Sequence, residues 1–181
     1  MKKPSWTIWL NNKKECKSWL DNYFKKRILR KSLAESKLYL KKSNHNLIFA
    51  NWITEKHENE IPELFGNETF YDWVISMYYY AVYHAALALV SKQGYESKNH
   101  SATLCFLIFY NYHLEKSLDE EDVELIASSL NKEDIEIIGT SKELREKASY
   151  DVHEIFEKRL AQQAKEQAVG FVNKIKELLE N

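Results

Sequence analysis

MYYYAVYHAALALV, residues 77–90, is the most apolar stretch of the chain. It is shorter than the roughly 20 residues that cross a membrane, so it predicts a buried helix and no membrane span. On a helical wheel the alanines share one face, two tyrosines a second, and Ser76, Tyr80 and His84 a third with polar tips. Because a helix this apolar must be covered on several sides, we expect contacts within a helical bundle and with a second copy of the chain in a homodimer.

Tyr80 and His84 have two interpretations. In the first, they are a buried pair satisfied by a local hydrogen bond. In the second, their polar tips line a cleft, where a phenol ring and an imidazole contact a base or a phosphate. The first interpretation is favoured on the residues alone, and the second defines a candidate site.

The remaining composition predicts one helical domain. Only four glycines and two prolines interrupt 181 residues, so we expect helix nearly everywhere and a bundle as the all-α fold. The first expected helices cover about 13–57, with a break near 42–46, then 69–93, ended by Gly94, and 99–116, capped by Asn99 or Ser101. A short helix follows, opened by a Ser117–Glu120 capping box, and another short one ends at Gly139. The last expected helix covers 152–180 and is capped by Asp151.

Charge is distributed unevenly along the chain. The first 50 residues hold 13 Lys and Arg against 3 Asp and Glu, and the other 131 hold 13 against 24. A basic segment such as KKRILRKS, residues 25–32, either meets phosphates or meets the acidic remainder of the protein and solvent, and the second interpretation is favoured. Two isolated cysteines predict neither a disulfide framework nor a zinc cluster, so we expect a reducing cytoplasm.

The sequence lacks the common catalytic motifs. Its four glycines are isolated, which excludes a dinucleotide-binding fingerprint and a phosphate-binding loop, and neither G-x-S-x-G nor H-E-x-x-H occurs. The six histidines contain no pair at i, i+4. His153 and Glu157 have the spacing of two metal ligands on a helix, but such pairs are common by accident, so we expect no metal and no cofactor.

Two blocks of sequence carry a resemblance to a known family. The first, YYYAVYHAALALVSKQGYESKNHSATLCF (78–106), resembles the central helix-turn-helix of HEPN domains, which are small helical bundles associated with nucleotides and RNA. The matching positions are Tyr79-Tyr80-Ala81, Tyr83-His84-Ala85-Ala86, Gly94 and Lys98-Asn99-His100-Ser101. The second block, LREKASYDV (144–152), is similar to a Leu-Arg-x-x-Ala-Asp-Tyr segment, with Ser149 at the position where Asp is common.

The resemblance implies an organisation and partners. It implies an antiparallel bundle of four or five helices over residues 30–181, with 1–29 as a basic helical extension and a loop insertion near 58–68. It also implies association with RNA or a nucleotide, a nucleotidyltransferase-type protein as partner, and a homodimer. The substrate-binding candidates that follow are Tyr80, His84, Lys98, His100, Ser101 and Tyr150.

Many members of the resembled family are metal-independent ribonucleases, often toxins, with an Arg-x(4–6)-His motif. Here Arg145 precedes His153 with seven residues between them, and eight helical steps rise about 12 Å. A new helix start at Asp151 would bring the two side chains closer together. We therefore expect a non-catalytic RNA- or nucleotide-binding module. The alternative is a ribonuclease in which Arg145 binds phosphate and His153 is the base, with Tyr150 positioning the substrate and His84 and His100 as substitute bases.

Overall fold

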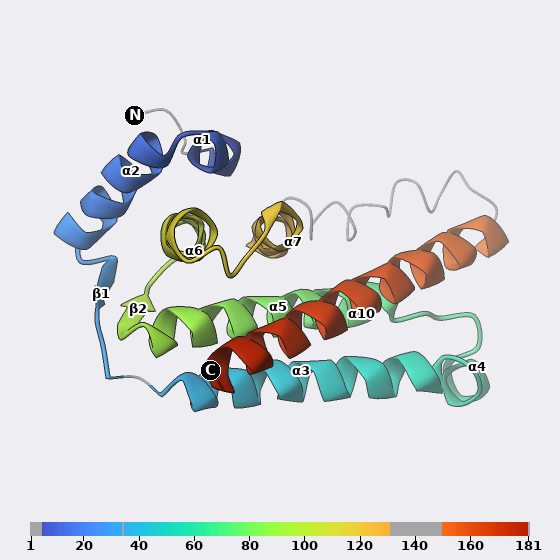
Figure 1. Cartoon of the computed structure of the whole chain (residues 1–181). Helices are drawn as coiled ribbons and strands as arrows, with labels where there is room; N and C mark the ends of the chain where they lie inside the picture. The colour runs from blue at the N-terminus through green and yellow to red at the C-terminus, as the bar shows by residue number, and fades with distance from the viewer. Residues whose placement is uncertain (1–4, 34, 131–149, 181) are drawn as a thin grey trace.

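The computed structural model describes residues 5–33, 35–130 and 150–180, with the side chains of 130 and 150–156 left aside. Its elements are α1 (Trp6–Asn11), α2 (Lys13–Lys25), β1 (Leu29–Lys31), α3 (Ser36–Lys56), α4 (Glu60–Phe65), α5 (Tyr71–Lys92), β2 (Tyr95–Ser97), α6 (His100–Leu107), the π-helix η1 (Ile108–Leu114), α7 (Glu120–Leu130) and α10 (Tyr150–Glu180). In Figure 1, α3, α5 and α10 run along one another, α6 and α7 cross over α5, and α1 and α2 cover α6. The predicted all-α bundle is confirmed.

α5 is the central helix, as its apolar sequence predicts. Its alanine face is fully buried and packs against α3, where the Ser43 hydroxyl donates to the carbonyl oxygen of Ala81 at 2.7 Å. Small residues such as Ala50 and Ala85 let the two helices approach closely. The alanine face is therefore occupied within one chain, so it gives no support to the expected homodimer, which stays a prediction.

The apolar length of α5 also bears on membranes. Within the described residues, α5 is long and apolar enough to cross a membrane, yet 67% of its most apolar window is buried inside the protein. A buried core helix passes this test for the same reason, so the packing accounts for the composition without a membrane.

α3 differs from the expected helix boundaries. It continues unbroken through 42–46, where a break is expected from the sequence, because the Asn46 amide donates to the Lys42 carbonyl within the helix instead of competing with it. The real break lies between α2 and α3, where Arg27 has φ +54° and the chain forms β1. The expected loop at 58–68 contains the short helix α4.

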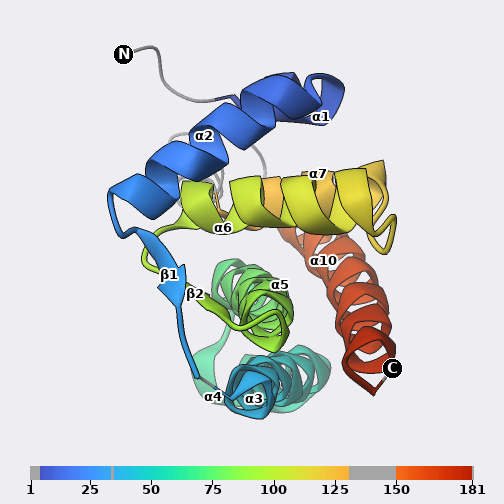
Figure 2. The same cartoon turned by 60° about the vertical axis from the view of Figure 1, so that its left-hand side comes forward.

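A short ribbon and a thiol contact join the N-terminal helices to the bundle. β1 pairs antiparallel with β2, with Leu29 opposite Ser97, and Gly94 between α5 and β2 takes φ +81°, as expected of a glycine that ends a helix. Figure 2 shows this ribbon beside α5, with α2 above α6. Cys16 of α2 and Cys105 of α6 are both fully buried, with their sulfur atoms 3.9 Å apart.

The start of α7 corrects the predicted capping box. Asp119, rather than Ser117, caps the helix: its carboxylate accepts from the Asp122 backbone at 2.9 Å, and the Asp122 carboxylate accepts from the Asp119 backbone at 3.0 Å. Lys174 of α10 bonds both carboxylates, which ties α7 to α10. Ser117 instead accepts from the amide of Asn111, a fully buried side chain in the π-helix.

α10 is described as helix from Tyr150 onward. Asp151, expected to be the N-cap, is therefore the second residue of the helix, and His153 lies inside it. The helix is described from one residue before the expected cap, and the approach of His153 to Arg145 stays a prediction. Arg145 and Gly139 lie outside the described residues, so nothing is said of their positions.

Candidate functional site

The predicted site residues fall into two groups. Tyr80 and His84 lie on α5, and Lys98, His100 and Ser101 lie where β2 leads into α6. Of the other three, Tyr150 and His153 are placed by backbone only, at the start of α10, and Arg145 lies outside the described residues.

Four rings form a continuous row, here called the ring row: Tyr80, His84, Tyr83 and His100. The ring centroids of Tyr80 and His84 are 6.4 Å apart, those of His84 and Tyr83 are 5.7 Å apart, and those of Tyr83 and His100 are 4.5 Å apart. The row thus crosses from α5 to the first residue of α6. Tyr80 at its outer end is 52% exposed, so a planar group has access to its face.

His84 is held in one tautomer. Its Nδ1 lies 2.7 Å from the Tyr80 carbonyl oxygen, and because a carbonyl only accepts, Nδ1 carries the proton and Nε2 is left as an acceptor. Asn46 Nδ2 lies 3.5 Å from the same Nδ1 and is a neighbour rather than a donor to it. Burial lowers the pKa of His84 from its usual 6.5, which the carbonyl bond opposes and the nearby charge of Lys42 reinforces. The ring is therefore a neutral imidazole near pH 7.

Tyr83 supports the middle of the row. Burial raises the pKa of its hydroxyl, and a hydrogen bond with Thr103 of α6 partly opposes that shift. The phenol therefore stays protonated, and its bond to Thr103 fixes the ring between His84 and His100. Tyr83 is not among the predicted binding residues, although it is part of the quoted family pattern.

Ser101 and Lys98 have separate surroundings. Ser101 is exposed at the start of α6 and faces Tyr23 of α2, whose pKa burial raises to about 12 while the interaction with Ser101 partly opposes that shift. Lys98 is exposed two residues before α6, and its backbone N–H donates to the Ile28 carbonyl at 3.0 Å.

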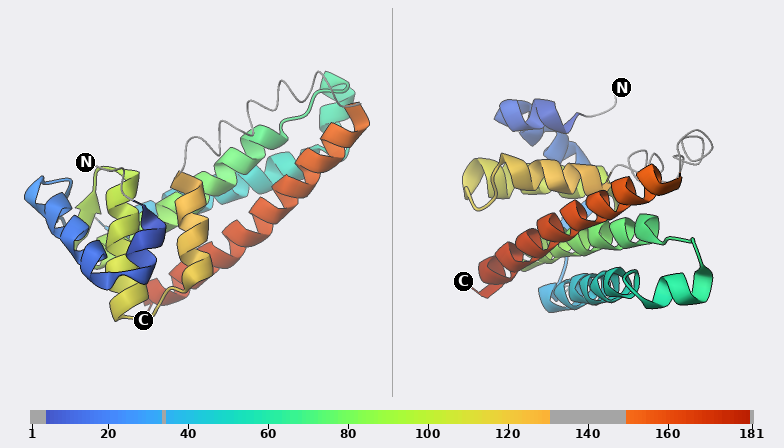
Figure 3. Two further views of the ribbon diagram at one scale, coloured as in Figure 1. Left: turned by 90° about the horizontal axis from the view of Figure 1, so that it is seen from above. Right: turned by 90° about the vertical axis from the view of Figure 1, so that its right-hand side faces the viewer.

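The start of α10 lies far from the ring row within one chain. Glu157 of α10 accepts from Thr69 at 3.0 Å, just before α5, and Lys92 at the other end of α5 bonds the Leu178 carbonyl. Between these two contacts, His84 lies level with about residue 170 of α10, which is roughly 25 Å from His153 along the helix. Figure 3 shows the start of α10 beside α4, at the opposite end of the molecule from α6. Within one chain, the backbone of Tyr150 and His153 is thus separated from the ring row.

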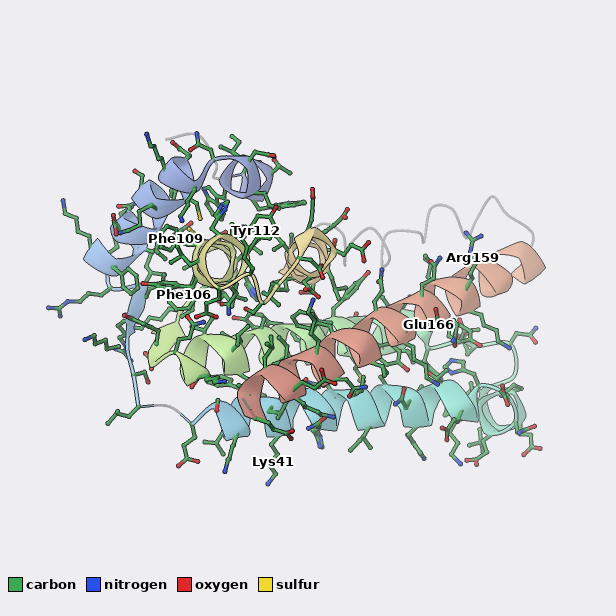
Figure 4. The ribbon with its side chains drawn as sticks, in the orientation of Figure 1. Lys41, Phe106, Phe109, Tyr112, Arg159 and Glu166 are labelled. Carbon is green, nitrogen blue, oxygen red and sulfur yellow. The ribbon has the colours of Figure 1, made fainter. Side chains whose placement is uncertain are left out.

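Residues of α3 next to the ring row are missing from the predicted site. Asn46 and Lys42 approach His84, yet no motif marks them, because only the packing of α3 on α5 brings them there. Figure 4 shows the next side chain, Lys41, pointing away from the bundle on the outer side of α3. Sequence reasoning had no local signal for this contribution.

A separate cleft of about 460 Å³ lies between the end of α3 and α10. Lys158, Arg159 and Lys165 line it together with Glu55 and Glu58, so its charges largely compensate one another. In the part of the chain that the structure describes, no three His, Cys, Asp or Glu residues gather in a way that would hold a metal ion.

Comparison with known proteins gives one match. The family model described as "HEPN domain" matches residues 55–179 of the chain, which include α5, α6, α7 and most of α10. Neither a curated protein nor a solved structure matches the chain.

Proposed function

The chain belongs to the HEPN domain family, and we propose that it is a non-catalytic module that binds RNA or a nucleotide on the ring row. The observation that carries this proposal is the row itself, which ends in a tyrosine that is half exposed and contains a histidine held as a neutral acceptor. Rings of this kind stack on unpaired bases, and a neutral imidazole accepts a hydrogen bond from a base amine or a ribose hydroxyl.

Charge around the row supports an anionic ligand. Lys42 lies close enough to His84 to lower its pKa, and Lys98 stands exposed at the His100 end. A base stacked on Tyr80 would place its phosphate within reach of these ammonium groups, which act as point charges for phosphate. Because the Tyr83 ring lies between His84 and His100, the two imidazoles are not placed together on one phosphate, and the proposal is binding rather than cleavage.

Binding is tested by fluorescence anisotropy with labelled single-stranded RNA and with unlabelled nucleotides as competitors. We expect Tyr80→Ala to weaken RNA binding by about five-fold or more, the cost of one stacked ring, and Tyr80→Phe to retain most of it. Phe65→Ala is the matched control, because Phe65 on α4 is also 52% exposed. Equal binding by wild type and Tyr80→Ala, or no binding by wild type, would refute the proposal.

A further inference from the structure

A second pair of rings lies exposed on α3. Phe49 and Trp52 are 40% and 52% exposed, with their ring centroids 5.9 Å apart and their planes 21° apart. The Lys56 ammonium lies 5.8 Å from the centre of the Trp52 ring and also pairs with Glu60. Two large rings stacked in solvent bury little area, so folding alone does not account for them. We call Phe49 and Trp52 the ring pair.

The ring pair continues the surface of the ring row. α3 and α5 run antiparallel, because Asn46 lies beside His84 whereas His57, further along α3, stacks on Tyr71, which is earlier in α5. Phe49 lies three residues beyond Asn46, and hence on the same side of α3 one turn further along. On α5 the corresponding turn, counted back from His84, is that of Tyr80. Phe49 and Tyr80 are therefore level with each other on the same side of the α3–α5 pair, and Trp52 continues from Phe49 around α3.

The surface of α3 is basic along its length. The helix carries Lys37, Lys41, Lys42 and Lys56 against a single carboxylate, Glu55. Two copies of this helix face repel each other, which disfavours a second chain as the occupant of the ring pair. Rings flanked by lysines on both sides instead fit a flexible polyanion whose bases stack and whose phosphates meet ammonium groups.

We propose that the ligand is a single-stranded RNA chain of several nucleotides, which runs from the ring row onto the ring pair. This inference rests on the proposed function and identifies its ligand as a strand rather than a mononucleotide. Tyr80 is separated from Trp52 by the spacing of two packed helices, about 8–10 Å, and by a rise of about 4.5 Å along α3, while one nucleotide of a stacked strand advances about 3.4 Å. A single nucleotide on Tyr80 does not reach Trp52, and a strand does.

The test is the dependence of binding on RNA length. Oligouridines of about 4, 8 and 16 nucleotides, spanning the site sizes of single-strand binders, and uridine monophosphate are measured by anisotropy or competition. We expect Phe49→Ala and Trp52→Ala each to weaken binding of the longest strand by about five-fold or more, with the monophosphate unaffected. Trp52→Phe should restore most of the loss, and Phe65→Ala should cause none. Both rings are exposed, so circular dichroism should report folded variants.

Three results would overturn the inference. One is unchanged binding of every RNA by the ring-pair variants while Tyr80→Ala still weakens it, which leaves the proposed function standing. Another is a ring-pair variant that turns a sedimenting dimer into a monomer without altering RNA binding, because the ring pair is then a protein interface. The third is no RNA binding by wild type at any length, which refutes this inference and the proposed function together.

Discussion

A cross-link between Cys16 and Cys105 would test how the N-terminal helices dock on the bundle, a region outside the family match. Each thiol lies 3.5 Å from the carbonyl oxygen of the other cysteine, and the two sulfur atoms are 3.9 Å apart in a fully buried site between α2 and α6. A disulfide needs about 2.0 Å. A modest movement of the two side chains therefore suffices, and we expect mild oxidation with hydrogen peroxide to form an intramolecular disulfide with loss of two hydrogens.

The stabilisation expected from the disulfide follows from the length of the loop that the bond closes. The cysteines are 89 positions apart, which corresponds to about 4.6 kcal/mol of lost chain entropy in the unfolded state. Native-state strain lowers this value, so we expect about 2–4 kcal/mol. At about 2–4 °C per kcal/mol for a chain of this size, Tm should rise on the order of 5–15 °C.

Oxidation of the two cysteines should be slow. The hydrogen bond with Cys16, and then burial, raise the pKa of the Cys105 thiol, and the attacking thiolate is correspondingly scarce. Oxidation should therefore require opening of α2 and speed up in mild denaturant. Thiols are counted by alkylation in denaturant with mass spectrometry, and Tm by calorimetry, with Cys105→Ala as the control that cannot cross-link. The chain has only these two cysteines, so a monomer that keeps two alkylatable thiols after prolonged oxidation would refute this docking of α2.

Three further outcomes are expected. Burial lowers the pKa of His84, so the unfolded chain binds a proton at this residue more tightly than the folded chain does. The free energy of unfolding should therefore hold above pH 6.5 and fall as the pH drops through the folded pKa. Urea titrations of wild type and His84→Asn at several pH values measure this, and an equal dependence of unfolding free energy on pH in both proteins would contradict it. Asp119→Ala removes the cap of α7 and an ion pair with Lys174, and should cost about 1–2 kcal/mol in urea unfolding, with Asp119→Asn losing less. In metal-free assays we expect no RNA cleavage; cleavage abolished by Arg145→Ala or His153→Ala would establish the ribonuclease alternative.

Local patterns predicted the elements whose signals are local. The apolar length of α5, the positive φ at Gly94 and the Asn99 cap, which accepts from the Ala102 backbone at 2.8 Å, all follow from a few neighbouring residues. The capping box of α7 was wrong by two positions because S-x-x-E and D-x-x-D overlap there. The choice between them depends on Lys174, 55 positions away from Asp119. No local pattern contains that contact.

The candidate site likewise contains some residues that local patterns predicted and others that only the packing reveals. The family pattern identified Tyr80, His84 and His100, which lie in one row, while the contribution of α3 came only from packing. Tyr80 is exposed, so the interpretation of a buried pair is wrong for its ring, while the expected local bond is present between His84 Nδ1 and the Tyr80 backbone and leaves that ring exposed. A local hydrogen bond is therefore no argument against a binding role at this position.

The separation of the ring row from the start of α10 constrains any combined function. Within one chain, an RNA held on Tyr80 must extend roughly 25 Å to approach His153, which is several nucleotides of a stacked strand. A mononucleotide bound on the ring row is therefore out of reach of that histidine in the same chain. If the Arg145–His153 pair does act on RNA, its substrate must either be a long strand that the ring surfaces of α5 and α3 help to hold, or lie between two copies of the chain. In both cases the binding surface proposed on the ring row and the bond that breaks lie apart.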